Sequence, residues 1–261
     1  MRANRVRDLW RRGQPALGGW CNLPDSFSPE IVASTGVDWV CVDMQHGLID
    51  YQLAVQMLQA ISVTEALPLV RVPGNDTPLI GKCLDAGARG VIVPMVNSAA
   101  EADRAAASCR YHPAGVRSFG PVRARYYLGA DYYAHANDDV LCIPMVETRQ
   151  AVDVVEEIAA VEGVDGIFVG PADLSITLGL SPTADSSAPD LTDALRRIVQ
   201  ACRAYDVAPG IAGKAALARK RIEQGFTFVE VVNDAGLLQS AAVSAMESVR
   251  PRGLLGGPAY L

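Results

Sequence analysis

Lysine is almost missing from this sequence, which has three lysines against twenty arginines. Catalysis through a Schiff base needs a desolvated lysine that points into the site. Lys82 and Lys220 fall in amphipathic helical patterns, and only Lys214 follows a run typical of a strand. The sequence therefore disfavours imine chemistry.

Cysteine pairs with the spacing of redox or zinc motifs are also missing, because none of the six cysteines belongs to a Cys-x-x-Cys pair. Several lie inside apolar, strand-like runs, where a free thiol behaves as a small hydrophobic side chain. We therefore expect free thiols, a reducing compartment and a cytoplasmic location. The six residues are Cys21, Cys41, Cys83, Cys109, Cys142 and Cys202.

Several other signatures do not occur. No apolar run approaches the ~18 residues that a membrane span requires. There is no Gly-x-Gly-x-x-Gly turn before a helix, no Walker loop and no Gly-x-Ser-x-Gly elbow. A net charge of −6 and a pI near 5.1 argue against a nucleic-acid or anionic-membrane surface. Chemistry on small molecules is the class that remains.

What the sequence does contain is a regular alternation of strand-like and helix-like segments. Most of the strand-like runs are continuously apolar, as in strands buried on both faces. The predicted strands are 17–23, 39–44, 68–72, 90–96, 140–146, 166–169, 208–212 and 227–232. The predicted helices are 29–34, 52–63, 78–86, 99–110, 150–160, 191–204, 215–224 and 237–248. Eight repeats in 261 residues predict an α/β fold, a (β/α)8 TIM barrel in which residues 1–261 form a single domain.

Three segments lie outside this alternation. The arginine-rich N-terminus has the basic bias of a transit peptide, but Asp8 interrupts it and no apolar stretch follows. A short amphipathic helix with Val6, Leu9 and Trp10 on one side is the better interpretation. Residues 111–139 are predicted to form a long irregular loop, a feature that is usually functional. Residues 183–189 are predicted to form a connector.

Polar residues at the ends of the predicted strands form the candidate site, because a TIM barrel carries its active site at the carboxyl ends of its strands. Each residue alone has a simpler explanation. Glu147 can begin a helix and Asp173 can cap one. Arg71 can belong to a structural ion pair, and His46 can be a satisfied, partly buried histidine. Their convergence on one rim favours function. The set is Asp43, Gln45, His46, Arg71, Glu147 and Asp173.

Glu147 and Asp173 are candidate ligands of a hard metal ion. Two carboxylates, a bound oxoacid and waters complete the octahedral oxygen shell that Mg2+ or Mn2+ prefers. No Cys/His cluster competes for zinc. Arg71 offers a planar fork that suits a carboxylate or an enolate oxygen, and His46, as a histidine, is the candidate for proton transfer. A metal-enolate route is therefore favoured over an imine route.

The long loop contains a cluster of basic and aromatic residues that has three interpretations. It can bind an anionic substrate, form a subunit contact, or be a solvated loop without a function. The cluster is Arg117, Arg123, Arg125, Tyr126 and Tyr127.

Six short motifs carry a resemblance to a known family. They are D-M-Q-H-G at 43–47, P-L-V-R-V-P at 68–73, V-P-M-V at 93–96, Y-H-P-A-G-V-R at 111–117, V-E-T-R at 146–149 and G-P-A-D-L-S at 170–175. In this order they closely resemble the HpcH/HpaI aldolase/citrate lyase family of class II pyruvate-dependent aldolases, such as 4-hydroxy-2-oxoheptanedioate aldolase and 2-keto-3-deoxy-sugar-acid aldolases. The similarity runs from about Asn4 to about Val249 with few gaps.

The resemblance implies a barrel of the pyruvate/phosphoenolpyruvate superfamily with a metal-dependent site. It implies that Glu147 and Asp173 bind the divalent metal, which is Mg2+, Mn2+ or Co2+. Arg71 matches the arginine that stabilises the pyruvate enolate. The family also assembles as a homohexamer, a dimer of trimers, so a C-terminal oligomerisation segment that packs on a neighbouring subunit is expected.

Further site residues follow from the same resemblance. His46 and Asp85 match the catalytic His-Asp pair. The backbone near Gly120 and Ala172 lies where family members hold the pyruvate carboxylate.

Two departures concern the other substrate, the acceptor aldehyde. Met145 stands where some members have a polar glutamine beside the metal, and residues 119–122 replace the smaller residues of the heptanedioate enzyme. In the same loop, Arg123 and Tyr126 are the candidates for reading the acceptor.

The predicted function is a carbon–carbon lyase that reversibly cleaves a 4-hydroxy-2-oxo acid into pyruvate and an aldehyde through a metal-bound pyruvate enolate. A base linked to His46 and Asp85 removes the C4 hydroxyl proton, and protonation at C3 releases pyruvate. The expected partners are these small molecules, with no nucleic acid and no membrane. One alternative is a citrate-forming or CoA-thioester lyase or synthase of the same family. Another is a non-catalytic ligand-binding barrel.

Overall fold

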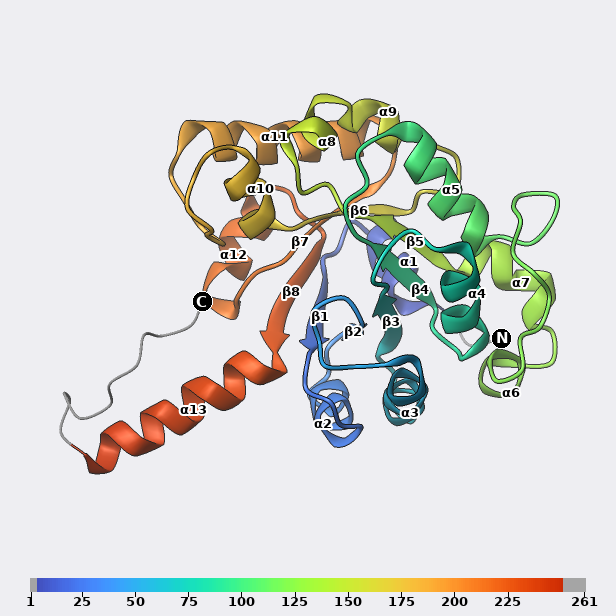
Figure 1. Ribbon diagram of the computed structural model, residues 1–261, viewed down its shortest axis with the longest axis horizontal. Coiled ribbons are helices and arrows are strands. Elements are labelled where there is room, and N and C mark those ends of the chain that lie inside the picture. The colour runs from blue at the N-terminus through green and yellow to red at the C-terminus, as the bar shows by residue number, and fades with distance from the viewer. Residues whose placement is uncertain (1–3, 251–261) are drawn as a thin grey trace.

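A computed structural model describes residues 4–250 and contains eight parallel strands surrounded by helices (Figure 1). The hydrogen-bonded order is β5-β4-β3-β2-β1-β8-β7-β6. The ring comes close to closing between β5 and β6, where the Val146 amide donates to the Phe168 carbonyl at 3.0 Å. The strands are β1 (Ala16–Cys21), β2 (Trp39–Asp43), β3 (Leu67–Arg71), β4 (Gly90–Val93), β5 (Leu141–Pro144), β6 (Gly166–Val169), β7 (Ala208–Ile211) and β8 (Phe228–Asn233). The predicted TIM barrel is confirmed.

Helices follow the strands and cover the outside of the barrel. Five of them begin at a side chain that accepts a hydrogen bond from a backbone amide three residues later, which satisfies a free donor of the first turn. These caps are Asp50, Asp76, Ser98, Thr148 and Asn233. The helices of the repeats are α2 (Phe27–Ser34), α3 (Tyr51–Ile61), α4 (Thr77–Asp85), α5 (Ala99–Cys109), α8 (Arg149–Asp153), α9 (Val155–Ala159), α10 (Pro171–Thr177), α11 (Pro189–Ala204), α12 (Ala215–Glu223) and α13 (Asp234–Val249).

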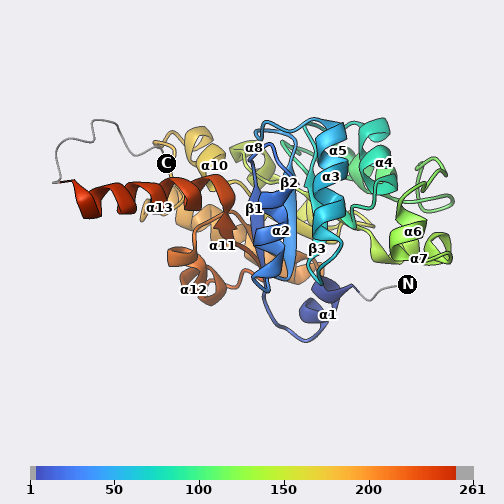
Figure 2. The same cartoon turned by 90° about the horizontal axis from the view of Figure 1, so that it is seen from below.

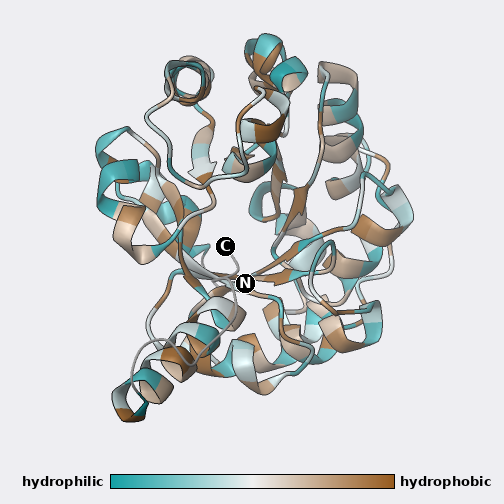
Figure 3. Cartoon of the chain, turned by 60° about the vertical axis from the view of Figure 1, so that its left-hand side comes forward, coloured by the Kyte–Doolittle hydropathy of each residue, from teal (hydrophilic) through white to brown (hydrophobic). Residues whose placement is uncertain are grey.

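The centre of the barrel is filled by aromatic side chains. Trp39 stacks on Phe228 with ring centroids 4.2 Å apart, and Trp20 stacks on Phe168 at 5.3 Å. Gly18 makes room for this packing, because a Cβ at that position would lie 1.9 Å from Trp39. In Figure 3 the central strands are mostly hydrophobic, while hydrophilic colour gathers on the outer sides of the helices. The interior is therefore a packed core rather than a pore.

The predicted N-terminal helix exists as α1 (Arg5–Arg11) and lies at the amino end of the barrel. Val6 is fully buried in the same cluster as the central aromatic residues. Trp10 packs edge-on against Phe228 with ring centroids 5.5 Å apart and donates its indole N–H to the Thr227 carbonyl. The helix thus closes the bottom of the barrel.

The prediction that residues 111–139 form one irregular loop is wrong in part. The segment contains α6 (Ala124–Leu128) and α7 (Tyr132–Asp139). These helices form a small core of their own, in which Leu128 and Tyr132 pack with Tyr111. The predicted helix 150–160 is also divided, because Val154 separates α8 from α9.

The last described helix, α13, extends away from the barrel (Figures 1 and 2). Its apolar side chains are largely exposed, namely Leu237, Leu238, Val243, Met246 and Val249. Residues 251–261, which belong to the predicted oligomerisation segment, lie outside the described residues, as do residues 1–3. Within residues 4–250, no helix is long and apolar enough to cross a membrane.

Candidate active site

A cavity of about 270 Å³ lies at the carboxyl ends of the strands. Its walls come from β1, β3, β6, β8 and the turns that follow β5, β6 and β7. Glu147, Asp173 and Arg71, which the sequence placed on one rim, all line it. The other lining residues that matter below are Trp20, Asn22, Met145, Gly170, Ala172, Ala184, Gly213, Lys214, Glu230 and Asn233.

Glu147 follows β5 and is almost fully buried, with 2% of its surface exposed. Burial raises the pKa of its carboxyl, and the negative charge of Asp173 raises the pKa further. Gly170 allows the carboxylate to approach the turn after β6, because a Cβ there would lie 2.4 Å from Glu147 Oε2. Asp173 lies in the first turn of α10, is exposed and faces the same cavity. Two carboxylates therefore share one cavity.

The position of Glu147 is supported by a strained backbone. Met95 has a φ of 55°, in the left-handed region that non-glycine residues seldom adopt. Its amide donates a 2.8 Å hydrogen bond to Glu147 Oε1. The turn after β4 thus directs one donor toward the carboxylate that follows β5.

Arg71 is held by Asp43 in a bidentate ion pair. The two residues are neighbours in the register of β2 and β3. Arg71 Nε and Nη2 donate to the two carboxylate oxygens of Asp43 at 2.8 and 2.5 Å. Burial alone lowers the pKa of Arg71, but the hydrogen bond and the charge of Asp43 outweigh it and raise this pKa. The guanidinium also lies 4.9 Å above the Trp20 ring, so it is fixed as a cation facing the cavity.

A chain of amide side chains continues from this ion pair to β8. Asn22 donates to Asp43 Oδ2 at 2.7 Å, and Asn233 donates to Asn22 Oδ1 at 2.9 Å. Burial raises the pKa of Asp43, but Arg71 outweighs it and the pKa is lowered. Asp43 is thus ionised and serves to position Arg71.

His46 and Gln45 lie in the turn after β2. Asp43 Oδ1 accepts hydrogen bonds from the backbone amides of both residues, at 3.3 Å for His46. The His46 side chain is exposed. Gln45 Oε1 is buried without a hydrogen-bond partner among the described residues.

Asp85, the predicted partner of His46, lies at the other end of the barrel. It is the last residue of α4, which returns the chain from the carboxyl end of β3 to the amino end of β4. Its carboxylate forms a 2.7 Å ion pair with Arg117. Gly120 lies beside it, since a Cβ there would be 3.7 Å from Asp85 Oδ2. Between residues 4 and 250, no hydrogen bond or ion pair joins Asp85 to His46.

The loop candidates Arg123 and Tyr126 are also at that end. Arg123 donates to the Ala86 carbonyl at 2.7 Å and to Ser62 Oγ at 2.8 Å, and so ties together the ends of α3 and α4. The side chain of Tyr126 is 78% exposed. Ala172, by contrast, lines the cavity. One chain therefore brings together the residues predicted to bind the metal and the enolate but not the whole predicted set.

Two cavity residues stand outside the predicted site. Lys214, named for its place after a strand, lines the cavity, but its side chain is exposed to water. Glu230 was missed altogether, because it lies within β8 rather than at its end. A charged residue inside an otherwise apolar strand was the signal that could have found it.

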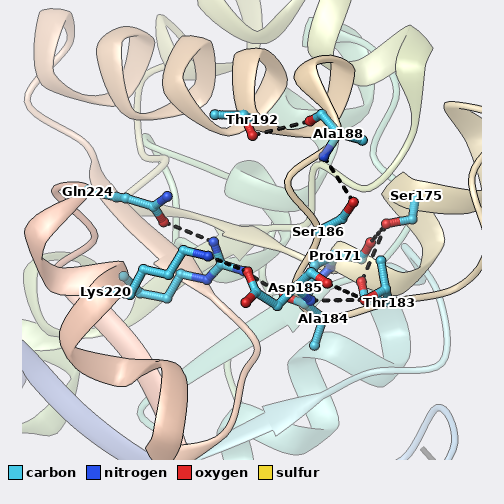
Figure 4. A network of polar contacts seen from close by, with 11 residues as sticks. Pro171, Ser175, Thr183, Ala184, Asp185, Ser186, Ala188, Thr192, Lys220 and Gln224 are labelled. Carbon is cyan, nitrogen blue, oxygen red and sulfur yellow. Dashed lines mark hydrogen bonds and ion pairs between the residues drawn. The ribbon is translucent and has the colours of Figure 1, made fainter.

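The loop between α10 and α11 closes one side of the cavity. Ser175 Oγ donates to the carbonyl of Pro171 and also to that of Thr183 (Figure 4). On the other side Lys220 forms a 2.6 Å hydrogen bond with Asp185. These contacts hold Ala184, which lies between them, at the cavity wall. The predicted connector is thus a fixed part of the site.

A larger cavity of about 460 Å³ lies at the amino end, between α1 and the turn before β3. Glu147, Asp173 and Arg71 do not line it, and active sites of this fold lie at the opposite end. The smaller cavity is therefore the candidate site.

The donor set of this cavity suits a hard divalent cation. Two carboxylates face it from neighbouring turns, and the mutual repulsion that raises the pKa of Glu147 is relieved when a cation lies between them. Within residues 4–250, no group of three or more His, Cys, Asp or Glu side chains is placed to hold a metal ion. The remaining ligands would thus come from substrate and water.

A barrel with acids and an arginine around a cavity at its carboxyl end defines a class of enzymes acting on small anionic substrates. The HpcH/HpaI aldolase/citrate lyase model matches residues 17–241, and the chain belongs to this family. It is 40% identical to the hydroxypyruvate/pyruvate aldolase of Rhizorhabdus wittichii, over 95% of this chain and 99% of that one. The expected carbon–carbon lyase is thereby confirmed.

Two further relatives agree. The 4-hydroxy-2-oxo-heptane-1,7-dioate aldolase of Salmonella paratyphi B is 37% identical over 92% of each chain. The crystal structure of an HpcH/HpaI aldolase/citrate lyase family protein from Burkholderia cenocepacia J2315 superimposes with a TM-score of 0.88 at 35% identity, covering 95% of this chain and 100% of that one.

Proposed function

We propose that this enzyme is a divalent-metal-dependent aldolase that reversibly cleaves a 4-hydroxy-2-oxo acid into pyruvate and an aldehyde. The observation that carries the proposal is the meeting of Glu147, Asp173 and Arg71 around one cavity. The names of the two aldolases to which the chain is similar support the same substrate class.

Glu147 and Asp173 would hold the cation, Mg2+, Mn2+ or Co2+. When bound, such a cation acts as a Lewis acid that polarises the 2-oxo group. Arg71 stabilises the negative charge that develops on the same oxygen. Two of its five N–H groups are used by Asp43, which leaves donors for the substrate. Because the ion pair fixes the guanidinium beforehand, no reorganisation is needed during the reaction. The backbone at Ala172 would bind the carboxylate of pyruvate.

His46 is the proposed proton-transfer group, paired with Asp85. Since these residues lie at opposite ends of one barrel, the pair needs Asp85 of a second chain. Gly120, Arg123 and Tyr126 lie at the same end of the barrel as Asp85. They too would have to come from a second chain in order to contact the substrate. We therefore propose that the enzyme works as a homo-oligomer, with a hexamer as the expected form. The exposed apolar side chains of α13 support association, because contact with a second subunit would remove this apolar surface from water.

The decisive experiment is proton exchange at C3 of pyruvate in D2O, followed by NMR without any aldehyde. Exchange should require added Mg2+, Mn2+ or Co2+ and should stop with a chelator. A panel of aldehydes with pyruvate and each metal then identifies the acceptor. Glu157→Ala, which removes an exposed carboxylate on α9, is the matched control and should exchange normally. Full exchange in metal-stripped protein would contradict the metal route, and no exchange under any condition would contradict a pyruvate enolate as the intermediate.

A further inference from the structure

Glu230 is a buried carboxyl group that faces the active-site cavity. It belongs to β8, is 6% exposed and lines the same cavity as Glu147 and Arg71. Its Oε2 accepts a 3.1 Å hydrogen bond from the Gly213 amide. No salt bridge in the part of the chain that the structure describes involves Glu230. Burying a carboxyl there without a cation in direct contact costs free energy of folding. Its presence therefore indicates a role in function.

The charges around Glu230 are unevenly distributed. Burial raises the pKa of Glu230 to about 7, although the Gly213 amide, the positive charge of Arg71 and a hydrogen bond from the Asn233 side chain lower it, and the negative charge of Asp43 on β2 raises it. β1 and β7, the strands beside β8, contribute no charged side chain. Glu147, Asp173 and Lys214 face the same cavity from the other walls. On the helices that pack against β8, α12 contains the buried Arg221 and α13 begins with Asp234.

We propose that Glu230 determines substrate specificity at the β8 wall, where it accepts a neutral hydroxylated group and rejects a second carboxylate. The inference rests on the proposed aldolase function. A protonated carboxyl group both donates and accepts a hydrogen bond, which matches a hydroxyl group. The ionised form still accepts from a hydroxyl, but it repels an anionic substituent at close range in a poorly solvated cavity.

Glycolaldehyde and glyoxylate test this directly, because they differ mainly in having CH2OH or COO− beside the aldehyde. The ratio of kcat/KM for glycolaldehyde to that for glyoxylate is measured with pyruvate as donor at pH 6 and pH 8. In wild type this ratio should increase with pH, because Glu230 ionises between the two values. In Glu230→Gln it should be independent of pH and, at pH 8, about tenfold lower than in wild type. Glu223→Gln, an exposed change on α12, should behave as wild type.

Proton exchange of pyruvate distinguishes a failure of the proposed role of Glu230 from a failure of the proposed aldolase function. Glu230→Gln should retain exchange, because pyruvate and its enolate are held by other residues. If exchange is retained but the ratio equals that of wild type at pH 8, the role of Glu230 is refuted and the aldolase function stands. If wild type itself lacks exchange, the proposed aldolase function is refuted. Should Glu230→Gln not fold, a wild-type ratio that is constant between pH 6 and pH 8 still refutes the inference.

Discussion

The buried carboxyl of Glu230 should make the stability of the barrel depend on pH. Its pKa is about 7 in the folded protein, against 4.5 for an ordinary glutamate. The folded state therefore binds this proton more tightly than the unfolded state. The resulting stabilisation is fully present below pH 4.5 and is lost as the pH increases to about 7. Since each pKa unit corresponds to about 1.4 kcal/mol, the loss at pH 8 is about 3 kcal/mol.

Glu230→Gln removes this dependence while its amide oxygen can still accept from the Gly213 amide. We expect the free energy of unfolding of the variant, relative to wild type, to increase by about 3 kcal/mol between pH 4 and pH 8. Urea unfolding of both proteins, at equal concentration and with chelator, measures this difference, and all other titrating groups cancel. Glu223→Gln should show no such trend. A difference that stays constant with pH would mean that the pKa of Glu230 in the folded protein equals its ordinary value.

Three further predictions concern the chemistry. Glu147→Ala or Asp173→Ala should abolish turnover without unfolding the barrel, as monitored by circular dichroism, and a chelator should mimic either variant; activity that survives both treatments would remove the basis of the metal site. Borohydride added with pyruvate should leave no covalent adduct, because the side chain of Lys214 is exposed to water rather than desolvated in the site; a pyruvate-sized mass increment on this lysine would overturn the enolate route. Arg71→Ala should remove both aldol cleavage and pyruvate exchange, since both pass through the same enolate. Cleavage within about threefold of wild type, a loss below about 1 kcal/mol, would show that Arg71 serves only to pair with Asp43.

Much of this fold could be predicted from the sequence because its strands are continuously apolar. All eight predicted strands occur, and their bounds shift by three residues or fewer. The acids of the site were visible for the same reason, since Glu147 directly follows such a run and Asp173 follows another after a turn of three residues. What the sequence did not give was the partner of Arg71. That contact depends on the register of β2 and β3, which places Asp43 beside it, and register is a property of the assembled sheet.

The missed features could not be predicted because a sequence pattern describes one segment at a time, whereas these features depend on contacts between segments. Helices α6 and α7 are stabilised by packing around Tyr132, so their own composition resembles a loop. Glu230 stands in the middle of a strand. Only the closed barrel turns that position toward the cavity and makes a carboxyl there a neighbour of Arg71.

Asp85 illustrates the same limit of sequence patterns for contacts between chains. A resemblance between sequences carries over the identity of a residue but not the chain in which it acts. Here Asp85 is the last residue of α4 and is paired with Arg117, whereas His46 follows β2 at the other end of the barrel. Glu147, Asp173 and Arg71 need no second chain, since one barrel holds them around one cavity. Under the proposed function, enolate formation and proton transfer would thus place different demands on the protein: the first would depend on the fold, and the second on how the folded chains associate.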